Sequence, residues 1–280
     1  MDDGTPHLIH ADLTREIIGA GMDVHNALGP GWDEMDYHLA MLEALAKRGV
    51  QAESHLRGNL MHRGEHVDRF ELDIIVEDTV VLELKHIQSN FAPEHYAQLI
   101  NYLKFWKKDL GMLINFGLEQ LRFKRIPYTP RSGEVVATGL WDELKQAEPT
   151  LTDKFLSVCQ SLISEHGVGF GETTSRSLLE VACKEAGLII QIPTVNLKFE
   201  ETNLGTRAIS GFMLNARILV KVTALMEKTT AADLARLMSY MRQSNLRCGI
   251  LVNFGRRQLC IRGVMNHQKS GLHQSAGKIA

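Results

Sequence analysis

The chain has 280 residues, of which 44% are hydrophobic and 23% are charged, as in ordinary globular domains. No apolar run approaches the ~20 residues of a membrane helix, the polar N-terminus lacks a secretory signal pattern, and the four cysteines form no CxxC pair, so we expect a cytoplasmic protein with free thiols. The formal net charge of −2 gives weak support for nucleic-acid binding, because a strong binder often carries a basic surplus, although a local basic stripe could still neutralise phosphates.

The first half of the chain begins with two predicted helices. In the first, Ile17 and Val24 recur at helical spacing, Thr14 supplies a start signal, and the Gly-Pro-Gly of residues 29–31 ends the helix. The second helix ends near Gly49, a candidate C-cap. Its apolar residues share one face, namely Met35, Leu39, Leu42 and Ala46.

Four strands and a third helix follow. Strands at 70–76 and 80–87 are joined by a short hairpin connection. Pro93 opens a helix, and strands at 111–116 and 121–126 close the unit. The order α-α-β-β-α-β-β, with room for a further strand near 51–62, predicts a mixed α/β fold in which helices flank a small sheet.

The second half of the chain repeats the first at an offset of 138 residues, which identifies a tandem duplication. We expect the register to break once, with a loop before Asn215 longer by four residues and the following hairpin shorter by four. The matches run from Leu13-Thr14 on Leu151-Thr152, through Gly29, Gly31 and Glu34 on Gly167, Gly169 and Glu172, to Asn115-Phe116-Gly117 on Asn253-Phe254-Gly255.

This repeat predicts the domain organisation. A first domain covers residues 1–128, and a second copy covers residues 151–265. Residues 129–150 open with proline, serine and glycine, so we interpret them as a linker. Residues 266–280 contain few apolar side chains, and we expect a disordered tail.

Chemistry in the first domain is predicted on the hairpin of its first two strands. Alternation along the second strand puts Glu83 and Lys85 on one face, and Asp73 on the preceding strand can lie beside Glu83. Two neighbouring carboxylates repel each other, and a divalent cation removes that penalty. Oxygen ligands suit Mg²⁺ or Mn²⁺, and Lys85 beside the ion could activate water. The alternative is a hairpin whose charges merely face solvent.

Further residues extend this pattern into one that resembles a known family. Glu34 lies at the start of the second helix, and Gln98 and Tyr102 lie one turn apart on the third. The series Gly31-x-x-Glu34-x-x-Tyr37, Asp73, Glu83-x-Lys85, Gln98 to Tyr102 and Leu113 to Gly117 resembles the bacterial GxxExxY family, which is assigned to the PD-(D/E)XK nuclease superfamily of restriction-endonuclease-like fold.

The resemblance implies two tandem restriction-endonuclease-like α/β units and a Mg²⁺-dependent nuclease site. It implies that Asp73, Glu83 and Glu34 bind metal, that Lys85 activates water and that Gln98 orients water or phosphate. His25 also fits the family's first helix and could approach the site, the alternative being a buried histidine with a satisfied hydrogen bond. Tyr37 and Tyr102 are further candidates for substrate contacts, and for Tyr37 packing near Glu34 is favoured over chemistry.

The second copy is expected to keep the fold and to lose the site. By the offset with its register break, Glu172 stands for Glu34, Ser175 for Tyr37, Asn215 for Asp73, Lys221 for Glu83, Thr223 for Lys85 and Arg236 for Gln98. A lysine in place of the glutamate disfavours a cation by electrostatics alone. The copy is locally basic, so Arg236 and its neighbours could hold nucleic acid, or this face could simply be solvated.

Three functions therefore stay open. The first is a metal-dependent nuclease with one active and one degenerate unit, acting on nucleic acid, with DNA favoured over RNA. The second is a non-catalytic scaffold that binds nucleic acid or protein with the same fold, since a fold does not fix a function. The third is a self-associating protein whose units build a larger assembly.

Overall fold

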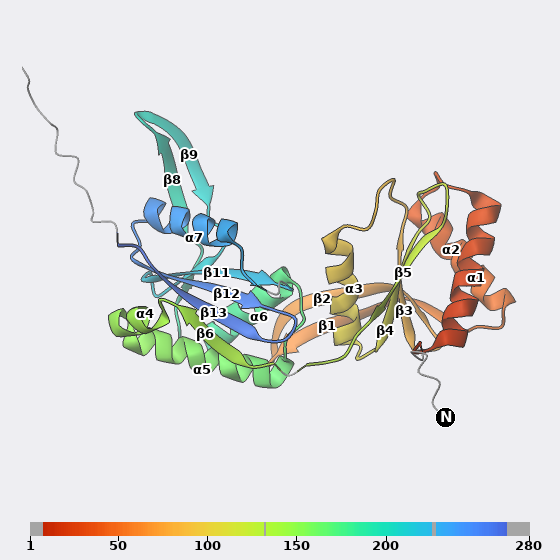
Figure 1. Cartoon of the computed structure of the whole chain (residues 1–280), viewed down its shortest axis with the longest axis horizontal. Coiled ribbons are helices and arrows are strands. Elements are labelled where there is room, and N and C mark those ends of the chain that lie inside the picture. The colour runs from red at the N-terminus through yellow and green to blue at the C-terminus, as the bar shows by residue number, and fades with distance from the viewer. Residues whose placement is uncertain (1–7, 132, 226–227, 268–280) are drawn as a thin grey trace, which may run out of the picture. The chain divides into compact units, whose positions relative to one another are not determined.

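A computed structural model describes residues 8–131, 133–225 and 228–267, and the chain divides into two compact units (Figure 1). Unit 1 comprises residues 1–132 together with 167–178, and unit 2 comprises residues 133–166 and 179–280. The expected tail lies almost wholly outside the described residues. No helix in the described part of the chain is long and apolar enough to cross a membrane.

Two helices begin unit 1. Helix α1 (Ala11–Leu28) starts three residues before Thr14, whose hydroxyl donates to the Ala11 carbonyl within the first turn. It ends at Gly29, where φ is 68°, a conformation that glycine adopts without strain. Helix α2 (Glu34–Lys47) begins at the Asp33 N-cap with a capping box. Both helix boundaries thus depend on local backbone chemistry.

The sheet of unit 1 has five strands in the order β1-β2-β3-β4-β5. Strands β3 and β4 are parallel, and the other neighbours are antiparallel. Helix α3 connects the parallel pair, and its first residue is Pro93, as predicted. The elements are β1 (Ala52–His62), β2 (Glu65–Val76), β3 (Val80–Lys85), α3 (Pro93–Phe105), β4 (Leu110–Asn115) and β5 (Arg122–Pro127).

The two faces of this sheet have different roles. Helices α1 and α2 cover one face, and α3 lies over the other (Figure 1). Leu82 and Leu84 of β3 join the core beneath α1 and α2, together with Ile17 and Met41. Because side chains alternate along a strand, Glu83 and Lys85 face the α3 side.

Helix α2 has apolar residues on two faces, and only one of these faces packs on the sheet. The residues that pack on the sheet are Tyr37, His38, Met41 and Leu45. Most of the stripe predicted from the sequence is at the surface, since Met35 is 51% and Leu39 is 60% exposed and Ala46 is exposed, whereas Leu42 packs against the core. Because α2 is apolar on two sides, helical periodicity could not decide which side meets the core.

Unit 2 contains a six-stranded sheet in the order β6-β13-β12-β11-β10-β7 and a separate hairpin, β8-β9. Strands β11 and β12 are parallel, as are β13 and β6. Helix α7 covers one face and α4 and α5 the other (Figure 1). The elements are α4 (Trp141–Ala147), α5 (Pro149–His166), β7 (Ile190–Gln191), β8 (Thr194–Phe199), β9 (Thr202–Ala208), β10 (Phe212–Leu214), β11 (Ile218–Ala224), α7 (Ala231–Gln243), β12 (Cys248–Phe254) and β13 (Leu259–Met265). Helix α6 (Glu172–Glu185) belongs to unit 1 up to Leu178 and to unit 2 from Leu179.

The segment 129–150, which we predicted to be a linker, is largely folded. Strand β6 (Val135–Gly139) pairs with β13, and α4 follows it directly. Helix α4 is anchored by Trp141 and Leu144, which are 6% and 0% exposed. Pairing with a strand more than a hundred residues away supplies the stability that the proline- and glycine-containing sequence did not indicate.

Backbone geometry repeats at the same offset as the sequence. Helix α7 begins and ends 138 residues after α3. The pairings of β3 with β4 recur between β11 and β12, where Val80 with Leu110 becomes Ile218 with Cys248. Left-handed glycines recur too, with φ of 110° at Gly31 and 113° at Gly169. This agreement supports two tandem nuclease-like units.

The predicted register break is wrong. Val76 pairs with Val80 across the first hairpin, and Leu214 pairs with Ile218 across the second, so each turn has three residues. Asn215 therefore occupies a turn position, with φ of 49° as at Glu77. The counterpart of Asp73 at the constant offset is Gly211, not Asn215.

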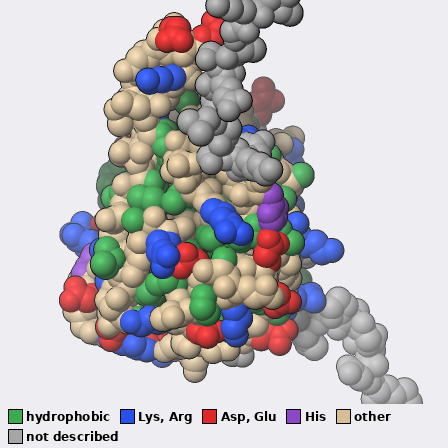
Figure 2. All heavy atoms as spheres, turned by 90° about the vertical axis from the view of Figure 1, so that its left-hand side faces the viewer, with side chains coloured by type: hydrophobic (Ala, Val, Ile, Leu, Met, Phe, Trp, Pro, Cys, Tyr) green, Lys and Arg blue, Asp and Glu red, His purple; other side chains and the backbone are tan. Residues whose placement is uncertain are grey.

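Charges on the face of the molecule seen in Figure 2 are mixed in sign. Lysine and arginine side chains lie between acidic and hydrophobic ones, without a continuous basic patch. This distribution agrees with the net charge of −2.

Candidate active site

Three charged side chains share one face of the β2–β3 hairpin in unit 1. Asp73 Oδ2 accepts a hydrogen bond of 2.8 Å from the backbone nitrogen of Leu84. Glu83 and Lys85 flank Leu84 and point to the opposite face from it. The Lys85 ammonium donates to Glu83 Oε1. Two acids and an amine thus meet in the arrangement predicted from the sequence.

Glu83 is the most buried member of this group. Its side chain is 0% exposed, and its Oε2 has no hydrogen-bond partner among the described residues. The pKa of Glu83 is raised to about 8, first by burial and then by the negative charge of Asp73, against the opposing effect of Lys85. A buried carboxylate oxygen without a partner is costly, so this position fits a bound cation.

Burial also affects the pKa values of Asp73 and Lys85. It raises the pKa of Asp73, although the hydrogen bond from Leu84 and the charge of Lys85 oppose that shift. For Lys85, burial alone would lower the pKa, but the charge and hydrogen bond of Glu83 and the charge of Asp73 raise it overall. Lys85 therefore keeps its positive charge beside two acids whose own ionisation is disfavoured.

Helix α3 supplies Gln98 and Tyr102 to the same face. Gln98 Nε2 donates to Tyr102 Oη at 2.8 Å. Burial raises the pKa of the Tyr102 phenol, and the charge of Glu83 adds to the shift. Tyr102 thus lies near the carboxylates, and Gln98 is held by it one turn earlier on the helix.

Glu34 lies near this group, but its carboxylate does not come together with those of Asp73 and Glu83. Its charge raises the pKa values of Asp73 and Glu83. Its carboxylate is 47% exposed and lies 3.4 Å from His86 Nδ1. Among the described residues, the ligand atoms of the three acids do not all lie within 4.8 Å of one another. The pair Asp73 and Glu83 is therefore the part of the predicted metal set that the structure brings together.

His25 and Tyr37 are held by contacts within the fold. His25 Nε2 lies 2.8 Å from the Leu118 carbonyl oxygen. The Tyr37 hydroxyl donates to the Gly29 carbonyl at 2.8 Å, accepts from Trp32 N at 3.2 Å, and its ring stacks on Phe116. These polar groups already have protein partners.

His38 is a neighbour of the site that the sequence reasoning missed. It follows Glu34 by one helical turn, is 4% exposed, and its Nε2 has no hydrogen-bond partner in the described part of the chain. Its ring stacks on His55 at 4.5 Å. Burial lowers the pKa of His38, and His55 lowers it further while Glu34 opposes the shift. The spacing from Glu34 was the available signal.

In unit 2 the equivalent positions carry different groups. Gly211 has φ of 138°, and an added Cβ would lie 2.3 Å from the Val220 carbonyl oxygen, so no side chain fits there. Lys221 is 3% exposed. Thr223 Oγ1 donates to the Val252 carbonyl oxygen and to Asn253 Oδ1, each at 3.3 Å. Arg236, on α7, is exposed.

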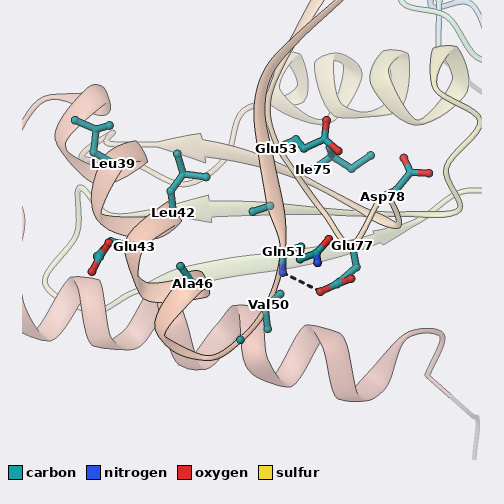
Figure 3. A pocket seen from close by; sticks show the side chains of 12 residues that line it. Leu39, Leu42, Glu43, Ala46, Val50, Gln51, Glu53, Ile75, Glu77 and Asp78 are labelled. Atoms are coloured by element: carbon teal, nitrogen blue, oxygen red, sulfur yellow. Dashed lines mark hydrogen bonds between the residues drawn. The ribbon is translucent and has the colours of Figure 1, made fainter.

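A cavity of about 970 Å³ in unit 1 lies apart from the acidic pair. It opens between α2, the start of β1 and the turn that follows β2 (Figure 3). Leu39 and Leu42 form its apolar side, while Glu43, Glu53 and Glu77 give it negative charge. Neither Asp73 nor Glu83 lines it, so it is not the candidate site.

Comparisons with known proteins identify the family of the chain. A model of the PD-(D/E)XK nuclease superfamily, whose members generally use divalent metals, matches residues 11–126 and 149–263. The two matched segments start 138 residues apart (149 − 11), as the repeat does.

Solved and curated proteins add little to this match. Two solved chains match, one being the crystal structure of SSO0001, with 19% identity and a TM-score of 0.28 over 33% of this chain. The match covers 48% of that chain, about half its length. No curated protein matches. Because the family model covers more than half of the residues, the chain belongs to the PD-(D/E)XK nuclease superfamily.

Proposed function

We propose that unit 1 hydrolyses phosphodiester bonds of nucleic acid with the help of a divalent metal ion. The observation that carries the proposal is the buried, unpartnered Glu83 Oε2 on the face shared with Asp73 and Lys85. The match to the nuclease superfamily supports it, and so does the motif series that resembles the GxxExxY family.

Asp73 and Glu83 would hold the ion. Both offer carboxylate oxygens, the donors that Mg²⁺ and Mn²⁺ prefer. When bound, such an ion would stabilise negative charge on the phosphate and on an attacking water. Its positive charge would also offset the burial that raises the pKa values of both acids.

Lys85, Gln98 and Glu34 would act around this pair. The Lys85 ammonium stays charged beside Glu83, so it can stabilise the developing charge on phosphorus-bound oxygens. Gln98 can orient water or a phosphate oxygen through an amide held by Tyr102. Glu34 would contribute mainly through its charge, or through water between its carboxylate and the ion.

For unit 2 the observations favour the alternative, a binding or structural role without catalysis. Gly211, Lys221 and Thr223 replace the two acids and the amine. The missing acid cannot be restored by one substitution, because a Cβ at Gly211 would collide with backbone.

The test is cleavage of labelled DNA and RNA, single- and double-stranded, by the full chain with and without Mn²⁺ or Mg²⁺. We expect metal-dependent cleavage that falls at least about a hundredfold in Lys85→Ala, as for removal of a charge-stabilising group. The matched control is Lys47→Ala, which removes an exposed lysine of α2 paired with Glu43 and should retain activity. Equal cleavage by both variants, or none by the wild-type chain on any substrate, would contradict the proposal.

A further inference from the structure

Unit 2 carries an inverted charge where unit 1 carries its acidic pair. At the constant offset, Glu83 corresponds to Lys221 and Gln98 to Arg236. The strand pairings on both sides agree, since Glu83 pairs with Leu113 and Lys221 with Leu251. The same place in the same fold therefore holds cations instead of carboxylates.

Lys221 is buried without a close partner. It is 3% exposed, and it has no hydrogen bond or ion pair with any of the residues that the structure describes. Leu219, two residues earlier on β11, packs in a cluster with Leu237 of α7. Alternation along the strand points Lys221 to this same α7 face. Its Nζ is not among the fully buried, unpartnered side-chain atoms of the described residues, so the ammonium keeps access to solvent and an anionic ligand can reach it.

Among the described residues, Lys221, Arg236 and Asp233 together carry a positive surplus. Burial raises the pKa of Asp233, but hydrogen bonds of Thr230 and then the charges of Lys221 and Arg236 lower it overall, which places both cations near this carboxylate. Asp233 Oδ2 accepts two hydrogen bonds from Thr230, one from the backbone nitrogen at 3.0 Å and one from the hydroxyl at 2.7 Å. Among these three described residues, two positive charges and one negative charge leave one positive charge unmatched, which is equal and opposite to the charge of a phosphodiester.

We propose that Lys221 and Arg236 form a phosphate site in unit 2 that binds the backbone of nucleic acid without a metal ion. Lys221 would give a charge-assisted hydrogen bond from the base of the site, and Arg236 would bind from the exposed surface of α7. In unit 1 the carboxylates would need the proposed metal ion to bind a phosphate, whereas an ammonium binds a phosphate directly. The choice of nucleic acid as the source of the phosphate rests on the proposed function, but the site itself does not.

The experiment measures binding in the absence of metal. The full chain carries Asp73→Asn to suppress cleavage and is held in EDTA, and fluorescence anisotropy follows labelled single- and double-stranded oligonucleotides at several salt concentrations. In Lys221→Met we expect affinity to fall at least about fivefold for every sequence. The slope of log affinity against log salt should fall by about one, as when one phosphate contact is lost.

Lys198→Met is the matched control, because it removes an exposed lysine of β8 in the same unit. It should change affinity less than about twofold. Arg236→Gln restores the residue type of unit 1 at an exposed position, so it tests the site even if Lys221→Met fails to fold. Its affinity should fall about threefold or more. Circular dichroism melts show which variants are folded.

Equal binding by wild type, Lys221→Met and Arg236→Gln would overturn the site, as would equal losses in Lys221→Met and Lys198→Met. Inorganic phosphate separates the two sources of the ligand. Competition by phosphate against the oligonucleotide is expected. If phosphate binds in a Lys221-dependent manner but oligonucleotides do not, the nucleic-acid assignment is overturned. Cleavage by chains with intact Asp73 is scored separately, so failure of the nuclease proposal remains distinguishable.

Discussion

Lys85 donates a hydrogen bond to Glu83 from two residues away on the same strand, so the ammonium and the carboxylate lie on one face of β3. Glu83 nevertheless keeps a raised pKa, because burial and the neighbouring Asp73 outweigh the attraction to Lys85. The single positive charge of Lys85 therefore does not balance the two carboxyl groups of Asp73 and Glu83. This imbalance has consequences for stability and for metal binding.

The stability of the metal-free chain should depend on pH through Glu83. Its pKa is about 8 in the folded chain against 4.5 for the ordinary group, so between these values the folded state binds more protons than the unfolded state. Stability from this group is therefore present at low pH and is lost as pH rises from about 4.5 to 8. Urea unfolding in EDTA should show a midpoint that falls more steeply in wild type than in Glu83→Gln.

That difference isolates Glu83, because the histidines titrate in both chains. Equal slopes for wild type and Glu83→Gln across the window would contradict the raised pKa. Adding Mn²⁺ should restore stability of the wild type at pH 8, since an ion that binds the folded state stabilises it.

Asp73→Asn should separate folding from metal binding. The asparagine carbonyl oxygen can still accept the hydrogen bond from Leu84 N that Asp73 Oδ2 accepts now, so the melting temperature should change little. Loss of one anionic ligand should weaken Mn²⁺ binding at least about tenfold, measured by isothermal titration calorimetry. Asp12→Asn, at a side chain that is 93% exposed, is the control and should bind like wild type.

The sequence predicted the arrangement of Asp73, Glu83 and Lys85 because their pattern is local. Period-two alternation fixes the face of Glu83 and Lys85 once β3 is recognised, and a short turn brings Asp73 alongside. The helix opened by Pro93 and the strand at 52–62 were also found. Features that depend only on one strand and its hairpin partner could therefore be predicted from the sequence.

The errors concern contacts that no local pattern encodes. The pairing of β6 with β13 joins segments more than a hundred residues apart, so the segment 129–150 was interpreted as a linker. The alignment of Asn215 with Asp73 was wrong because it followed the similarity of the two residue types and changed the length of the turn, which is the same in both hairpins. Turn geometry, shown by the left-handed residues at Glu77 and Asn215, restores the register.

The orientation of α2 can be tested by paired substitutions. Leu39 is 60% exposed, whereas Leu45 is 0% exposed in the core. Leu39→Gln should change the free energy of unfolding by less than about 0.5 kcal/mol, and Leu45→Ala should reduce it by about 2–5 kcal/mol. Urea denaturation monitored by circular dichroism measures both. A large loss in Leu39→Gln would show that the outer stripe is covered, for example by a second copy of the chain.

Gly211, which directly precedes β10, provides a test of why unit 2 lacks an acid at this position. Both Gly211 and Gly187 have positive φ, 138° and 73°, so alanine is strained at either position. At Gly187 an added Cβ would meet only Lys154 Nζ at 3.5 Å, and the cost of Gly187→Ala should be about 1–2 kcal/mol. At Gly211 the same Cβ would lie 2.3 Å from the Val220 carbonyl oxygen. The backbone between β10 and β11 must then shift, so Gly211→Ala should cost at least about twice as much.

Denaturant unfolding of the two variants gives the comparison. Equal costs would mean that this backbone yields readily and that the absence of an acid there is a matter of sequence alone.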